Sequence, residues 1–138
     1  MYLSTSICRP THNIEEAVDD SNSKVIVDEV KKYIRENISE NLSGNILAGL
    51  VYITPDYLIR LFKKEEACTL VEYVTRERMF LASEMLRTME VPVSRVSIEV
   101  GYNNYCYFSK VFKKTYGKTP SQYKSEYQPD RQEDNNLL

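Results

Sequence analysis

Two segments of the chain, residues 52–64 and 102–114, concentrate the side chains that could bind an anion or the edge of a nucleic-acid base. Each segment mixes aromatic and basic residues and ends in Phe-Lys-Lys. Arg60 carries a guanidinium that can donate two parallel hydrogen bonds to O6 and N7 of a guanine. Lys110 and Lys113 lie one turn apart if their segment is helical, and their ammonium groups suit phosphates or base edges. These residues favour binding rather than catalysis.

Residues that commonly carry catalysis or hold a metal are sparse. The chain has a single histidine, His12, and its three cysteines (Cys8, Cys68 and Cys106) form neither a CxxC pair nor an even disulfide set. A zinc site or a His-based triad is hard to build from this inventory. There is also no nucleophile–base pair and no phosphate-binding loop motif. We therefore expect no enzymatic activity, no metal and no cofactor.

Charge is distributed unevenly along the chain. The net charge of −2 hides acidic ends: residues 1–23 hold one basic and four acidic side chains, and residues 128–138 hold one and three. Residues 24–127 then carry 16 basic and 13 acidic side chains, a mildly basic balance that permits nucleic-acid binding. We expect one domain over residues 24–127, flanked by a polar acidic linker or tail at 1–23 and a disordered acidic tail at 128–138. Without a signal peptide or an apolar run long enough to span a membrane, we expect a cytoplasmic protein.

Helical patterns cover nearly all of the expected domain, and no stretch alternates with a period of two. Thr54-Pro55 and the capping boxes that begin at Thr69 and Thr119 mark helix starts. The expected helices cover about 24–38, 43–51, 55–66, 69–88, 93–100, 104–116 and a short stretch from 120. The helix over 43–51 carries the apolar residues Ile46, Leu47 and Leu50. The apolar stripes expected on the other helices are Val27, Val30, Ile34 and Ile38; Tyr57, Leu58, Leu61 and Phe62; Leu70, Val71, Val74, Phe80, Leu81, Met85 and Leu86; and Tyr107, Phe108 and Phe112.

An internal repeat links the two basic segments. Residues 52–64 recur as residues 102–114 at an offset of 50, with aromatic on aromatic and basic on basic. Each copy follows a short helix across a tight turn, which is the helix-turn-helix pattern, whose second helix can enter a major groove. The two units are expected at about 43–66 and 93–116. The helix over 69–88 would be roughly 30 Å long, close to the roughly 34–36 Å between successive major grooves on one DNA face.

The two repeats resemble the DNA-binding domain of AraC/XylS-type transcription regulators. The resemblance rests on residues 47–64, on 100–114 and on the stretch Tyr116-Gly-Lys-Thr-Pro-Ser-Gln-Tyr123, and it covers about residues 24–127. It implies a bacterial, all-helical fold of about seven helices in two subdomains, joined by a long central helix, that binds duplex DNA. Three positions depart from the family pattern: Ala67 replaces a glycine, Ser97 an alanine and Cys106 a serine. If residue 67 must be left-handed, alanine costs roughly 1 kcal/mol there, and the Ser97 hydroxyl could bond back to its own helix.

Outward residues of the second helix in each unit are the candidate DNA contacts. In the first unit, Arg60 is the best candidate for reading a base, Ile59 could touch a thymine methyl or lie partly in the core, and Asp56 more simply stabilises the helix N-terminus. The full candidate set is Asp56, Ile59, Arg60, Lys63, Lys64, Asn104, Tyr105, Cys106, Ser109, Lys110, Lys113 and Lys114.

A helical protein-interaction module that has kept the fold and lost DNA binding remains an alternative, and the acidic ends support it. The resemblance also implies RNA polymerase as a possible partner, and a sensing or receiver domain as part of a longer regulator.

Overall fold

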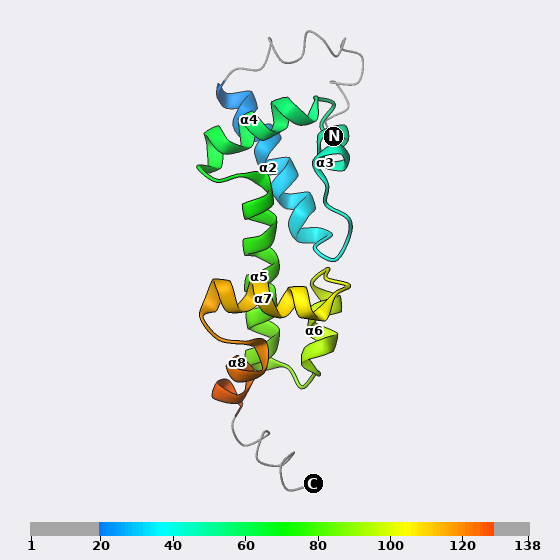
Figure 1. The fold of residues 1–138 in the computed structure, drawn as a ribbon. Coiled ribbons are helices and arrows are strands. Elements are labelled where there is room, and N and C mark those ends of the chain that lie inside the picture. Colours follow the sequence, from blue (N-terminus) through cyan, green and yellow to red (C-terminus); the bar gives the residue numbers. More distant parts are fainter. Residues whose placement is uncertain (1–19, 129–138) are drawn as a thin grey trace, which may run out of the picture. The chain divides into compact units, whose positions relative to one another are not determined.

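The computed structural model describes residues 20–128, which form seven helices and contain no strand (Figure 1). The helices are α2 (Asp20–Glu36), α3 (Gly44–Leu50), α4 (Pro55–Glu66), α5 (Leu70–Thr88), α6 (Val93–Glu99), α7 (Tyr105–Tyr116) and α8 (Pro120–Tyr127). The predicted all-helical class is confirmed. Residues 1–19 and 129–138, where the two tails are predicted, lie outside the described residues. None of the helices within 20–128 is long and apolar enough to cross a membrane.

The chain divides into two compact units at residues 74 and 75, within α5. The first unit contains α2, α3, α4 and the beginning of α5, and the second contains the rest of α5 with α6, α7 and α8. Each unit has its own cluster of buried apolar side chains. A short helix, a turn and a longer helix therefore rest on a separate core in each unit.

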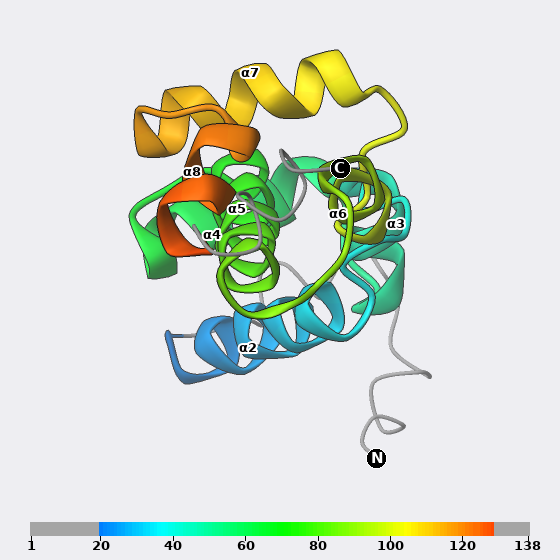
Figure 2. The same ribbon diagram turned by 90° about the horizontal axis from the view of Figure 1, so that it is seen from below.

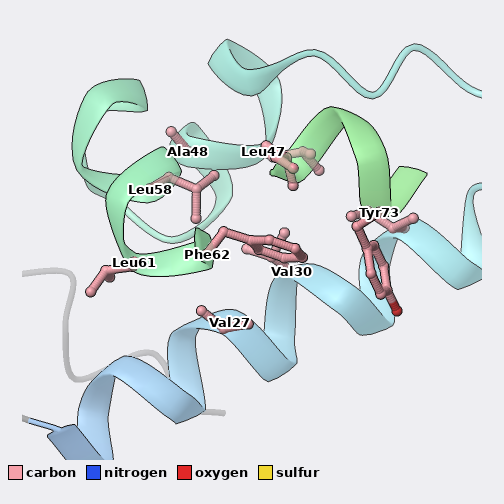
Figure 3. Close-up of a cluster of buried hydrophobic side chains, with 10 residues drawn as sticks. Val27, Val30, Leu47, Ala48, Leu58, Leu61, Phe62 and Tyr73 are labelled. Carbon is pink, nitrogen blue, oxygen red and sulfur yellow. The ribbon is translucent and has the colours of Figure 1, made fainter. Parts of the chain in front are cut away.

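The core of the first unit lies between α2, α3 and α4 (Figure 3). Val27 and Val30 of α2 face Phe62 of α4, whose ring is fully buried. Tyr73 of α5 packs edge-on against the same ring, with centroids 5.2 Å apart. This arrangement follows from the spacing of three and four residues between the apolar positions of each helix, which places them on one helical face.

The core of the second unit contains a continuous set of aromatic rings in contact. Phe108 and Phe112 of α7 are fully buried. The centroid of the Phe112 ring lies 4.7 Å from the centroid of the Tyr116 ring and 5.3 Å from that of the Tyr123 ring. Figure 2 shows α6, α7 and α8 arranged around the C-terminal part of α5. Buried residues of α5 and α6 complete the cluster: Met79, Ala82, Leu86, Val96 and Val100.

Two side chains predicted to be buried on α5 are exposed: Val71 is 74% exposed and Phe80 57%. The prediction followed one continuous stripe along the helix, whereas each unit buries its own set of α5 residues. Leu70 and Tyr73 are buried in the first unit, and the buried α5 residues of the second begin only at Met79.

The first helix also differs from expectation. Helix α2 begins at Asp20, within a polar run that was assigned to the linker, and it ends at Glu36, before Ile38. Short polar residues are favoured at helix N-termini as well as in loops, so composition alone misplaced this start. In α3, the buried residues are Leu47 and Ala48, while Ile46 and Leu50 are exposed.

Candidate nucleic-acid interface

Helix α4 begins as the sequence predicts. The Thr54 hydroxyl accepts a hydrogen bond from the backbone N–H of Tyr57 at 3.2 Å, and Pro55 occupies the first helical position. Asp56 follows in the first turn, exposed, where a carboxylate interacts favourably with the helix dipole. This position agrees with the stabilising role expected for Asp56.

The face of α4 opposite its core carries all five side chains proposed for this helix. Leu58, Leu61 and Phe62 are buried, so these five point away from the core. All are exposed: Asp56, Ile59, Arg60, Lys63 and Lys64. The guanidinium of Arg60 lies over the ring of Tyr57, 5.2 Å from its centroid. A guanidinium stacked on an aromatic ring has fewer rotamers to lose when it binds.

Helix α7 presents a similar outward face. Asn104 is its N-cap, and its side-chain oxygen accepts from the backbone N–H of Tyr107 at 2.9 Å. That oxygen is therefore already engaged in holding the helix start. Six of the candidate side chains are exposed (Asn104, Tyr105, Cys106, Lys110, Lys113 and Lys114), and Ser109 is half-buried.

Tyr107 was predicted to pack inward, and this prediction is wrong. Its side chain is 58% exposed, and its ring touches only the edge of the core, 5.9 Å from the ring of Tyr102. Tyr107 is followed at spacings of three and seven by Lys110 and Lys114, so all three share one side of α7. The prediction was wrong because an aromatic residue at the spacing of a buried stripe was assumed to be buried. Tyr107 instead adds a ring and a hydroxyl to the outward face of α7.

Ion pairs engage some of the charged residues near both outward faces. Glu66, at the end of α4, binds Lys31 of α2 at 3.0 Å, and this hydrogen bond raises the pKa of Lys31. In the second unit, Lys118 pairs with Glu126 of α8. Within residues 20–128, no ion pair involves Lys110 or Lys113. The outward face of α7 therefore carries uncompensated positive charge, as the sequence predicts.

The turns of the two units differ in length by one residue. The sequence repeat, in contrast, suggests a constant offset of 50 between corresponding residues of the two units. The left-handed residue is Tyr52 in the first turn (φ 61°) and Gly101 in the second (φ 102°), an offset of 49. The N-caps Thr54 and Asn104 return to an offset of 50. The second turn is therefore one residue longer, and Tyr52 matches Gly101 in conformation rather than its sequence counterpart Tyr102.

The Ser97 hydroxyl is buried and donates to the backbone carbonyl of Tyr102 at 3.1 Å. The expectation of a bond back into its own helix is therefore wrong, since Tyr102 lies beyond the end of α6. At the corresponding position of the first unit stands Ala48, which is also buried. The hydroxyl thus satisfies a carbonyl of the longer turn.

Comparisons with known proteins agree with this architecture. A family model described as "Helix-turn-helix domain" matches residues 47–126. The regulatory protein SoxS of Escherichia coli is 33% identical over 67% of this chain and 86% of its own length. The Msm operon regulatory protein of Streptococcus mutans is 30% identical over 75% of this chain and 37% of its own length. The chain thus spans well under half of the Msm operon regulator.

Solved structures show the same fold. The C-terminal domain of AraT, a response regulator from Geobacillus stearothermophilus, is 33% identical, with a TM-score of 0.71 over 73% of this chain and 84% of its own. Two helix-turn-helix units, each with charged side chains on the outward face of its second helix, are typical of a DNA-binding domain. The chain belongs to the AraC family of transcription regulators and forms the family's sequence-specific DNA-binding domain.

Proposed function

We propose that this chain binds duplex DNA through α4 and α7, each placed in a major groove, with the domain running from α2 to α8. The observation that carries the proposal is the outward face of α7. Three lysines stand there opposite the buried Phe108 and Phe112, so the core fixes the direction in which the positive charges point. Groups held in this way can bind phosphates on either side of a groove while neighbouring side chains reach the bases.

The two helices divide the work unequally in this proposal. Helix α4 contributes Arg60, which can recognise a guanine, and Ile59, which is 46% exposed and can contact a thymine methyl. Helix α7 contributes Lys110, Lys113 and Lys114, whose charge attracts the DNA backbone. We therefore expect the first unit to supply more sequence preference per contact, and the second unit to supply more salt-dependent affinity.

Successive major grooves on one face of DNA are about one helical turn apart. If α4 and α7 bind adjacent grooves, the chain should protect roughly 20 base pairs on one face in a hydroxyl-radical footprint. Protection of a single groove would contradict the engagement of both units. An absence of binding to any duplex at low salt would favour the protein-interaction alternative.

In the whole regulator, we propose that this domain acts together with a sensing or receiver domain and contacts RNA polymerase. The support is that relatives such as the Msm operon regulator are much longer than the matched segment. Co-purification of the full-length protein with RNA polymerase on promoter DNA, with and without α7 lysine substitutions, would test this part of the proposal separately.

A further inference from the structure

Arg78 of α5 lies against the turn between α6 and α7. A Cβ atom added to Gly101 would stand 2.8 Å from Cζ of Arg78 and 3.0 Å from its Nε and Nη2 atoms. Gly101 also has φ 102°, which side chains rarely adopt. The backbone conformation of the turn thus favours glycine, and a Cβ at this position would in addition displace the guanidinium of Arg78.

The same guanidinium reaches the start of α7 through Tyr102. Its Cζ atom lies 5.6 Å from the centroid of the Tyr102 ring. That ring in turn lies 5.6 Å from the ring of Phe108 and 5.9 Å from that of Tyr107. A continuous set of contacts thus runs from Arg78 through Tyr102 to the first turn of α7.

Burial strengthens the contact between Arg78 and Tyr102. Burial lowers the pKa of the Arg78 guanidinium and raises the pKa of the Tyr102 hydroxyl, and the positive charge of Arg78 opposes the second shift. Arginine remains charged at neutral pH because its pKa starts so high. A partly desolvated guanidinium over an aromatic ring attracts that ring more strongly than an exposed one does.

The first unit uses a different residue at the corresponding place. Val27, Val30 and Ile34 of α2 are buried with the same spacing as Met79, Ala82 and Leu86 of α5. This register places Ile26, which packs against the first core, where Arg78 stands in the second unit. The guanidinium contact therefore accompanies the longer turn, and the shorter turn has an aliphatic side chain there instead.

We propose that Arg78 is a positioning residue for the second recognition helix: through Gly101 and Tyr102 it fixes the orientation of the first turn of α7. In this way Arg78 determines base preference at the positions read by α7 without itself reading a base. The inference rests on the proposed function, because it requires α7 to contact bases.

The test compares Arg78→Met with Arg76→Met, which removes an equal charge from an exposed position two residues away on the same helix. Affinities are measured for duplexes changed at one base pair at a time. Positions are assigned to α4 by the preference lost in Arg60→Ala and to α7 by the preference lost in Cys106→Ala, an exposed candidate contact near the start of α7. Arg78→Met should reduce discrimination at α7 positions by about tenfold, the scale of one mismatched pair. It should leave α4 positions unchanged, and Arg76→Met should weaken all duplexes alike.

The ratio of affinities for two duplexes does not depend on the folded fraction, so a partly destabilised variant still gives a result. Arg78→Lys, which keeps the charge and loses the planar stacking group, should show an intermediate loss of preference. Preserved preference at α7 positions in Arg78→Met, or equal loss at both sets of positions, would overturn the inference alone. A wild-type chain without base preference at any position would overturn the proposed function as well.

A double-mutant cycle tests the contact itself. Gly101→Ala should lower the melting temperature more in the native background than beside Arg78→Ala, because removing the guanidinium removes the clash with the new Cβ and leaves only the strain of φ. Equal losses in the two backgrounds would show that Arg78 does not constrain this turn.

Discussion

Ala67 and Gly117 end the two recognition helices with the same left-handed backbone, at φ 61° and φ 79°. Each backbone N–H donates to the carbonyl of the lysine four residues earlier, at 2.9 Å for Ala67 and 2.7 Å for Gly117. The positions are thus equivalent, but only the second has the residue without a Cβ. The condition under which alanine was expected to cost energy at position 67, a left-handed C-cap, is therefore met in the structure.

Replacing Ala67 with glycine should therefore stabilise the first unit by about 1 kcal/mol, since the clash of Cβ with the following carbonyl disappears. For a unit of this size, the melting temperature measured by circular dichroism should rise by roughly 4–8 °C. The reverse change in the second unit, Gly117→Ala, is the matched control and should destabilise by a similar amount. A parent-like melting curve for Ala67→Gly would show that the strain is relieved elsewhere.

Phe62 and Phe112 should each be essential to the stability of their own unit. Both rings are fully buried, and Phe112 also contacts the rings of Tyr116 and Tyr123. Truncation to alanine should cost on the order of 3–5 kcal/mol in the free energy of unfolding, measured with urea. Phe80→Ala removes the same side chain from an exposed position and should cost under about 1 kcal/mol. If Phe62→Ala and Phe80→Ala lower the free energy of unfolding by the same amount, the assignment of buried faces is wrong.

Arg60→Ala should reduce sequence reading. Arg60 is exposed on α4 and stacked on Tyr57, in a position to offer two parallel hydrogen bonds to a guanine. The loss on the cognate site should be about 1–3 kcal/mol, with preference flattened at one base position. A binding-site selection with parent and variant measures both effects. Equal weakening on every sequence would instead identify Arg60 as a contact to the DNA backbone.

Lys113→Ala should reduce affinity without changing preference. Lys113 is exposed one turn beyond Lys110, where a point charge suits a phosphate. All sequences should weaken alike, and the slope of log affinity against log salt should fall by about one unit. Titrations at several salt concentrations measure this slope. A change of preference at a single base pair, with the slope unchanged, would show that Lys113 reads a base.

The features that the sequence predicted correctly are those encoded by nearby residues. The caps of α4 and α8 and the burial of Phe62 and Phe112 follow from spacings of three or four along one helix. The full capping box at Thr119 is present, with both of its hydrogen bonds.

The features that were missed depend on contacts between elements. The pairing of Lys31 with Glu66 and the packing of Arg78 on Gly101 join residues far apart in the chain. Tyr107 has the spacing of a core residue along α7. In the structure its ring packs beside the ring of Tyr102, at the edge of the core, and its side chain stays exposed. The twelve candidate DNA contacts stay a prediction, although eleven of them are exposed.

The extra residue in the second turn limits how the two halves could be exchanged. From the N-caps onward, residues 54–66 and 104–116 correspond one to one, so a chimera joined at Thr54 and Asn104 would transplant a recognition helix in frame. A junction placed two residues earlier, at Tyr52 and Tyr102, would exchange a residue with left-handed backbone for a residue without it. The recognition helices can therefore be exchanged between the two units, whereas each turn must stay with the short helix that precedes it.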